Sequence, residues 1–544
     1  MGQTVKYTPL PMTKSSSPVC RRRVSDRRIC CSLLPATQVA AGLLPLGFCD
    51  VVLAEWLPGL LADGKAAGDK WEVMASALHL APSVSVLLLS PALGVLSERA
   101  WDRGGCQGLH KLLAWQGLFW ALGAQLLLSS AVGFGMFLGD NVAHGPASLL
   151  LSGLGVVLYA VGRAALQVSF HARAAEAVPL PRLSAAFALA ALLRQVGEWL
   201  ALLVTSIRWG QLGYFPDFAT HACGVSSACF DTRIGFFAAM LLMLLGCPLA
   251  ALASVSGDVG RQQRRKQQSH SGESSTRSSS TPRRKQQLHS GASSTGAAST
   301  PRALPSQRSD LERASVVEDA LREPGARAVL TIAVLAWAGS LALEGCAAHF
   351  VAQEVLPGPT GDSALRNGRV QSLYVGMAFS ALTPRLLRIF GAFGLLLSGA
   401  LAQAALLLLA PMVRASAGEL LATTWLASFG AARALLLAVP PAIAARRARE
   451  RSTPVAVAMA IMCTPGPAAQ VAWAWAAGPV RGLLGSDVAV LCAGGASSVW
   501  AAAVCSYAMA CDRDGGRPSL RKAGVKGQPA LVLPGLSSRR HLRA

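Results

Sequence analysis

The sequence predicts an all-α polytopic membrane protein with twelve transmembrane helices in two halves of six. Of its 544 residues, 14% are charged and 52% are hydrophobic, whereas soluble domains carry about 25% charged residues. The hydrophobic residues form runs of roughly 20, the length that crosses a bilayer as a helix. One long polar segment divides these runs into two equal sets.

Twelve apolar runs are the predicted spans, and Pro or Gly inside them is compatible with spanning helices because neighbouring helices satisfy the freed backbone groups. The first half has 35–61, 74–96, 112–133, 147–172, 184–207 and 232–255. The second half has 328–350, 367–384, 391–412, 419–443, 454–477 and 487–511. The run 367–384 is the least apolar of the twelve.

The distribution of Lys and Arg predicts the orientation. Most of the 50 Lys and Arg residues fall in segments that share one side of the membrane: the tails 1–34 and 512–544, the central linker and four short loops. By the positive-inside rule we expect that side to be cytosolic. The net charge of +22 then lies near anionic lipid, and nucleic-acid binding is not needed to explain it. The plasma membrane is favoured, although the Arg- and Ser-rich start also admits an organelle transit peptide.

The central linker, 257–327, separates a first half at 35–256 from a second half at 328–511. It contains the tandem repeat RRKQQSHSGESSTRSSSTP–RRKQQLHSGASSTGAASTP, which is identical at 14 of 19 positions. Because so polar a stretch cannot bury enough apolar surface to offset its ordering entropy, we expect it to be disordered. Its serines beside arginines are candidate phosphate acceptors. Two six-span halves joined this way are typical of transporters.

Charged short loops follow the second span of each half. The first reads LGVLSERAWDRGG and the second LTPRLLRIFG. One interpretation is an ordinary helix end; the other, which we favour, is a gate whose charges pair with neighbouring helix ends. The gating residues so predicted are Gly94, Glu98, Arg99, Arg103, Gly105, Arg385 and Arg388.

Five segments carry a resemblance to a known family: SERAWDRGGCQ, AALQVSFHARAAE, VGEWL with SIRW, PRLLRIFG and AWAAGPVRGLLG. In order and spacing they resemble the sucrose–proton symporters and solute carrier family 45 sugar transporters of the major facilitator superfamily. The resemblance implies the major facilitator fold and sugar transport by alternating access, with or without proton coupling. It also implies a small-molecule solute and the bilayer as partners, and no cofactor.

The chain departs from this family at three places. Cys106 and Gln107 follow Gly105 where the family has two basic residues, and Pro384 replaces an Asp in the second loop. Ala160 stands where the family has a membrane-embedded Asp implicated in proton coupling. Proton coupling in the family's manner is therefore in question.

Ionisable residues inside spans are costly, about 2.5–3.5 kcal/mol each at a helix centre, and they mark transport pathways. In the resembled fold, helices 1, 4, 7 and 10 line the cavity, and Arg163 and Arg433 occupy equivalent depths in helices 4 and 10. The predicted substrate or coupling cavity comprises Asp50, Glu55, Arg163, Arg194, Gln195, Glu198, Glu344, Arg433, Gln470 and Trp473. Cavity histidines are also possible at 79, 171 and 349, although packing is the more frequent role of such residues.

Glu198 is the preferred proton carrier, because it lies mid-span with Arg194 one turn before it. The alternative is an i,i+4 ion pair that only stiffens its helix. Gln470 and Trp473 share a helix face that suits a sugar, or one that packs against a neighbour.

Other classes of protein lack their motifs here. HExxH, GxSxG and GxxxxGK[ST] are absent from the sequence, as is CxxC metal-ligand spacing, so we expect neither an enzyme nor a metal site. Cys223 and Cys229 share a predicted outer loop and form either a disulfide or two free thiols. Two functions remain as alternatives to sugar transport: an organic anion transporter, which the paired arginines suit, and a non-transporting sensor.

Overall fold

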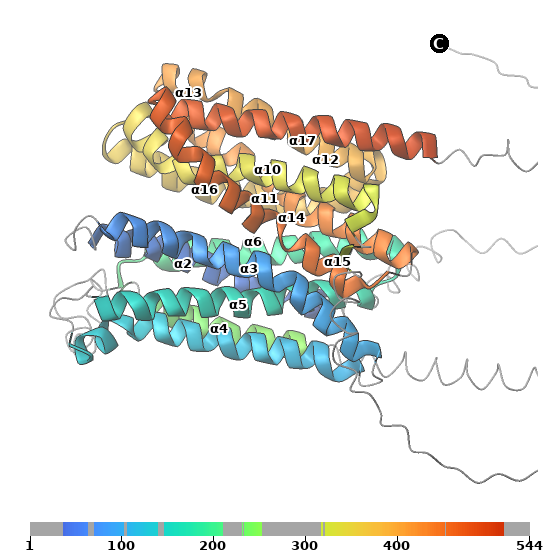
Figure 1. The fold of residues 1–544 in the computed structure, drawn as a ribbon. Coiled ribbons are helices and arrows are strands. Elements are labelled where there is room, and N and C mark those ends of the chain that lie inside the picture. Colours follow the sequence, from blue (N-terminus) through green and yellow to red (C-terminus); the bar gives the residue numbers. More distant parts are fainter. Residues whose placement is uncertain are drawn as a thin grey trace, which may run out of the picture.

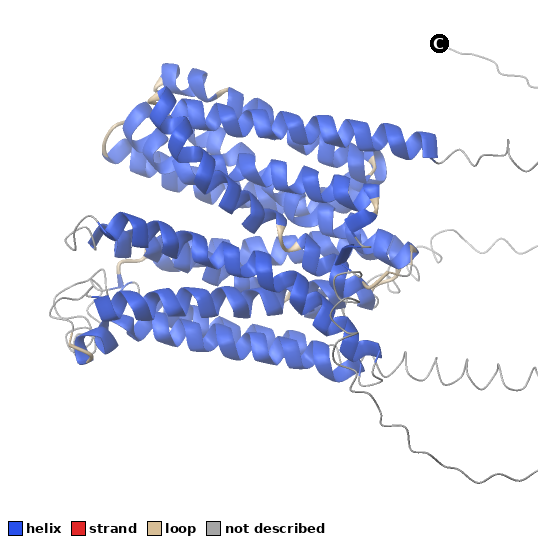
Figure 2. Ribbon diagram, in the orientation of Figure 1, coloured by secondary structure: helices blue, strands red, loops and turns tan. Residues whose placement is uncertain are grey.

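The computed structural model describes residues 36–63, 70–102, 106–139, 146–209, 231, 233–252, 317–318, 321–451 and 453–515. All regular structure in these ranges is helical (Figure 2), which confirms the predicted all-α fold class. The predicted N-terminal tail and most of the predicted linker and C-terminal tail lie outside them, as do Arg103, Gly105, Cys223 and Cys229.

The first half consists of six long helices. They are residues 36–40 with α2 (Leu43–Asp63), α3 (Lys70–Asp102), α4 (Cys106–Phe137), α5 (Pro146–Ala177), α6 (Leu183–Ser206) and Arg233–Leu252. The second half also has six. They are α10 (Pro324–His349) with the π-helical η4 (Phe350–Val355), α11 (Pro359–Phe390), α12 (Ala392–Leu408) with α13 (Ala410–Ser416), α14 (Glu419–Glu450), α15 (Val455–Met462) with α16 (Pro465–Leu484), and α17 (Asp487–Gly515).

Eleven of these described segments are long and apolar enough to cross a bilayer. The exception is α11, which contains the run 367–384. This helix carries charged and amide residues that lower its hydropathy, and it packs against α6 of the first half and α14 of the second.

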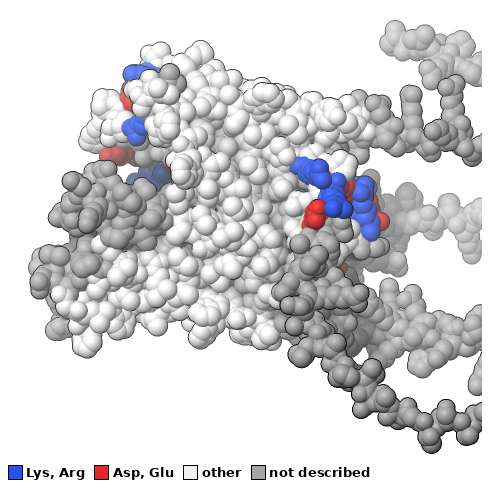
Figure 3. Space-filling view, in the orientation of Figure 1, with Lys and Arg blue, Asp and Glu red and all other residues white. Residues whose placement is uncertain are grey.

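The lateral surface of the molecule fits a bilayer. In the space-filling view the described Lys, Arg, Asp and Glu side chains appear at the two ends, and the belt between them is uncharged (Figure 3). Large apolar side chains such as Leu88, Phe119, Leu150 and Leu249 are exposed on this belt's helices. An apolar surface of this extent is expected to contact lipid rather than water.

The two predicted gating loops are mostly helix, so their assignment as loops was wrong. Helix α3 continues through Glu98 and Arg99 to Asp102, although their side chains lie outside the described set. Helix α11 likewise continues through Arg385 and Arg388, and both are exposed. Only Gly391, at φ 73°, separates α11 from α12. Charged residues at helix ends extend the helix beyond the apolar core, so hydropathy alone ends each span too early.

The predicted span 454–477 is also divided. It is broken between α15 and α16, where the sequence reads CTPGP. Pro465 begins α16 because proline fits the first helical position, where no backbone N–H is required. Pro465 and Pro467 lack the backbone N–H groups that would continue the hydrogen bonds of α15, so the helix breaks at this point.

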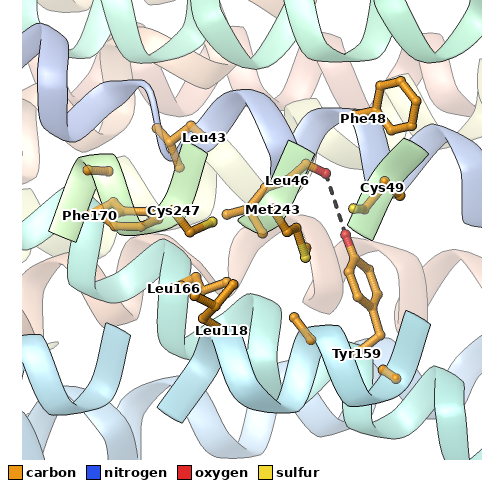
Figure 4. Close-up of a cluster of buried hydrophobic side chains, with 14 of the residues drawn as sticks. Leu43, Leu46, Phe48, Cys49, Leu118, Tyr159, Leu166, Phe170, Met243 and Cys247 are labelled. Carbon is orange, nitrogen blue, oxygen red and sulfur yellow. Dashed lines mark hydrogen bonds between the residues drawn. The ribbon is translucent and has the colours of Figure 1, made fainter. Parts of the chain in front are cut away.

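The six helices of each half form a bundle, and the halves lie side by side (Figure 1). Apolar side chains of α2, α4, α5 and the helix Arg233–Leu252 fill the first bundle (Figure 4). In the second bundle, separate clusters centre on Phe350 with Trp425 and on Ile332 with Val439. Because successive spans alternate in direction, residues 36 and 515 lie at the same end, which we call the tail end; the opposite end is the far end.

Two glycines bring α2 and α6 into backbone contact. A Cβ at Gly47 would overlap the carbonyl oxygen of Arg194, and a Cβ at Gly197 would overlap that of Leu44. Small residues of this kind let transmembrane helices approach closely. The approach brings residues that follow Gly47 on α2 near those that precede Gly197 on α6.

The halves meet at the tail end. A cluster of buried side chains from both halves contains Ala175, Phe187, Ala445 and Met459. Arg449 of α14 donates hydrogen bonds to the carbonyl oxygens of Ala175 and Val178. The two bundles diverge toward the far end (Figure 1).

The predicted gating residue Gly94 belongs to this tail-end contact. It lies where α3 packs on α15, and a Cβ there would overlap Ala460. Contact between the halves extends farther along α6 and α11, where the Trp199 and Tyr374 ring centroids are 6.0 Å apart.

Substituting Gly197 by Ala is expected to destabilise the protein by about 1–3 kcal/mol, because overpacking forces two touching backbones apart. Thermal unfolding of the purified protein in detergent measures this. Gly123→Ala is the matched control, since a Cβ at Gly123 meets nothing within 4 Å; its unfolding temperature should be unchanged or higher. Equal destabilisation by both substitutions would contradict the close approach.

Arg449→Ala should loosen the tail end, since it removes two hydrogen bonds between the halves. Cys463, buried at the α5–α15 contact, is then expected to react several-fold faster with N-ethylmaleimide, as measured by mass spectrometry of its peptide. Cys49 and Cys247 are internal controls, because they are buried inside the first bundle. Unchanged protection of Cys463 would count against tail-end closure by Arg449.

Candidate functional site

The centre of the molecule holds a network of ion pairs that begins at Asp50 on α2. Its Oδ2 atom lies 3.0 Å from Nη2 of Arg163 on α5 and 2.8 Å from Nη2 of Arg194 on α6. Tyr159, one turn before Arg163, donates its hydroxyl to Oδ1 at 2.9 Å. One carboxylate therefore joins two arginines and a tyrosine from two other helices.

Glu198 continues the network and crosses between the halves. Its Oε1 atom lies 3.4 Å from Nε of Arg194 and 3.1 Å from Nη2 of Arg433 on α14. Arg433 in turn places Nη1 3.4 Å from Oε1 of Glu344 on α10. The six residues are three acids and three arginines, so their formal charges cancel.

The network is buried in the middle and exposed at its ends. Glu198 is 1% exposed, whereas Arg433 is 32% and Glu344 45% exposed. At the other end Arg163 is 31% exposed. The network therefore has a buried centre and partly exposed side chains on α5, α10 and α14.

The i,i+4 ion pair expected between Arg194 and Glu198 is present. Each residue also pairs with a residue outside α6, namely Asp50 and Arg433. Stiffening of α6 therefore does not account for this pair.

Four residues predicted for the cavity lie outside this ion-pair network. Glu55 pairs with Arg369 of α11 at 3.0 Å, and both are exposed. Gln195 is buried and accepts a hydrogen bond from Ser380 of α11 at 3.3 Å. Gln470 accepts one from Ser83 of α3 at 2.6 Å, and Trp473 packs against the cluster around Phe350. Both amides thus connect the halves.

Ala160, which replaces the acid expected from the resemblance, is buried against α3 with Val86 and Ala164. An unpaired carboxylate in this apolar contact would be costly. The acidic group of this region is instead Asp50 on the neighbouring helix α2. Tyr159 and Arg163 are one helical turn apart, and this spacing was the only sequence signal that could have added Tyr159 to the site.

The histidines take part in other contacts. His171 lies 4.0 Å from the sulfur of Cys463 and beside Phe187. His349 pairs with the buried Asp487 at the start of α17. The side chain of the third histidine, His79, is outside the described set.

One group among the described residues has the composition of a metal site: His349, Glu354 and Asp487, whose ligand atoms lie within 4.8 Å of one another. Arg481 lies 3.2 Å from Asp487 and Arg414 lies 3.3 Å from Glu354. The two arginines balance the two carboxylates without a metal ion.

Comparisons with known proteins give the fold. No protein family and no curated sequence matches the chain, whereas solved structures do. The fucose:proton symporter FucP of E. coli is 12% identical, over 88% of this chain and 98% of its own, with a TM-score of 0.56. A bacterial homologue of the iron transporter ferroportin in the outward-facing state is 14% identical, over 88% and 99%, with a TM-score of 0.55.

The human organic anion transporter MFSD10 is 14% identical, over 86% of this chain and 98% of its own, with a TM-score of 0.51. The chain has the major facilitator fold. The proteins with these similar structures are named for different solutes: fucose, iron and organic anions. The structural similarity therefore does not identify the substrate of this chain. The sucrose–proton symporter and solute carrier family 45 branch is not confirmed by these comparisons.

Asp50→Asn should destabilise the fold strongly, because it removes the charge that holds Arg163 and Arg194. Removing one partner of a buried pair costs about 3–5 kcal/mol, to be measured as thermal unfolding in detergent. The matched control is Glu55→Gln, which breaks an exposed pair whose contribution should be about 0–1 kcal/mol. Similar losses in the two variants would mean that the Asp50 network does not support the fold.

Proposed function

We propose that the protein is an alternating-access transporter for a small organic anion, and that Arg163 and Arg433 bind this anion. The supporting observation is that two arginines, one from each half, belong to the same central network and keep about a third of their side chains exposed. A guanidinium presents a planar fork of donors that matches a carboxylate or a phosphate. The proposal involves binding and movement only, with no covalent step.

The acids of the site favour an anion over a sugar. Asp50 and Glu198 would have to bind sugar hydroxyls, but each already holds two arginines. The amides that would suit a sugar, Gln195 and Gln470, are bonded to Ser380 and Ser83. Sugar transport rests on the resemblance of the five sequence segments, and it remains the second candidate.

In alternating access, the two halves are in contact first at one end of the protein and then at the other. The tail-end contact is made of apolar side chains and includes hydrogen bonds from Arg449 to backbone carbonyls. These are the contacts that would have to separate for the tail end to open. In this proposal the substrate enters from the far end, rests on the arginines, and leaves when the tail end opens and the far end closes.

Uptake into proteoliposomes tests this function. Labelled lactate, succinate and benzoate are expected to accumulate or exchange, and labelled sucrose and glucose are not. Arg433→Gln should raise the KM for the carried anion about 10- to 100-fold, because a hydrogen bond to a charged group contributes about 1.5–3 kcal/mol. Arg163→Gln should act in the same direction.

Arg369→Gln is the matched control, since Arg369 also lies between the halves but pairs with an exposed acid. Its KM should match that of the natural protein. Sucrose flux without anion flux would restore the sugar candidate. Absence of any flux from correctly folded protein would favour a sensor that does not transport.

A further inference from the structure

We propose that Glu344 couples anion transport to protons: the substrate anion takes the place of its carboxylate on Arg433, and Glu344 then binds a proton. This inference rests on the proposed function and names the side chain that would bind the coupled proton. It starts from the charge balance of the network, in which three acids offset three arginines. A bound anion adds one negative charge to this balanced site, whose central acid Glu198 is 1% exposed, and a charge without a counter-charge is costly in such surroundings. Protonation of one acid restores the balance.

The three acids differ in how firmly they are held. Asp50 bonds two arginines and Tyr159, and Glu198 bonds two arginines while almost fully buried. Displacing either would leave two guanidinium groups without their shared acceptor. Glu344 has a single partner, at 3.4 Å, and is 45% exposed. Its replacement by a substrate carboxylate therefore costs least.

Arg433 is the only ion-pair partner of Glu344 among the described residues, and Glu198 pairs with the other terminal nitrogen of the same guanidinium. Several other charged residues on α10 and on the elements packed against it have ion-pair partners of their own. Asp487 pairs with His349 and Arg481, Glu354 pairs with Arg414, and Glu323 pairs with Arg447 and Arg451.

The proton cycle balances without covalent change in the substrate. When the anion takes Nη1 of Arg433, Glu344 turns to water on the open side and accepts one proton. The neutral acid and the paired anion cross together as the halves rock. On the other side the anion leaves, the proton returns to water, and the Glu344–Arg433 pair forms again. A monoanion would thus move with one proton and with no net charge.

Proton and anion fluxes in the same proteoliposomes test the coupling. With the natural protein, an inward gradient of one pH unit is expected to drive accumulation of a carried monoanion, up to about tenfold at one proton per anion. Anion entry should also acidify the interior of the proteoliposomes, as reported by a trapped pH-sensitive dye. In Glu344→Gln, exchange should persist at an altered rate, but accumulation and acidification should be lost. Glu344→Asp should restore both in part.

Two matched variants make the result specific. Glu354→Gln changes another acid of the same half, paired with Arg414, and it should keep coupling. Glu198→Gln tests the more deeply buried acid; loss of coupling there, with coupling intact in Glu344→Gln, would overturn the proposal and assign the proton to Glu198. Gradient-independent anion transport by the natural protein would also overturn it while leaving the proposed function in place. Failure of the natural protein to carry any anion would instead refute the proposed function.

Discussion

The ion pair between Glu198 and Arg433 is the contact on which the arrangement of the two halves depends. It joins α6 to α14 at 3.1 Å with the acid almost wholly buried. A charge in such surroundings must be paired, since breaking a buried pair costs about 3–5 kcal/mol. Each arginine that pairs with Glu198 also pairs with a second acid. Arg194 pairs with Asp50, and Arg433 pairs with Glu344. Movement of the halves must preserve these pairs or exchange them for substrate.

Close backbone packing supports this electrostatic arrangement. Gly47 and Gly197 allow α2 and α6 to touch, and Asp50 lies one turn beyond Gly47. The 2.8 Å contact between Asp50 and Arg194 is therefore a consequence of two missing side chains. At the tail end the halves are joined differently, by an apolar cluster that contains Phe187 and Met459 and by the hydrogen bonds of Arg449 to backbone carbonyls.

Sequence reasoning found most members of the central network but misjudged their neighbours. Charged residues inside apolar runs are conspicuous, and six of the ten predicted cavity residues prove to be one connected set. Gln195 and Gln470 were equally conspicuous, yet each bonds a serine of the other half. A polar side chain in a span indicates that it needs a partner without indicating which one. The predicted spans also ended too early, because α3 and α11 continue through charged residues beyond their apolar runs.

Composition and local pattern alone determined that the chain is helical, that it has two halves of six spans, and which spans carry charge. These are local properties, since a run of about 20 apolar residues needs a bilayer or a bundle wherever it occurs. Only the tertiary structure decided the pairings. Arg194 and Asp50 are 144 residues apart in the sequence, and Arg433 and Glu198 are 235 apart. Their contacts depend on how closely helices approach and on which faces meet, and these are set by packing of the whole bundle, including glycines far along the chain from the charges they bring together.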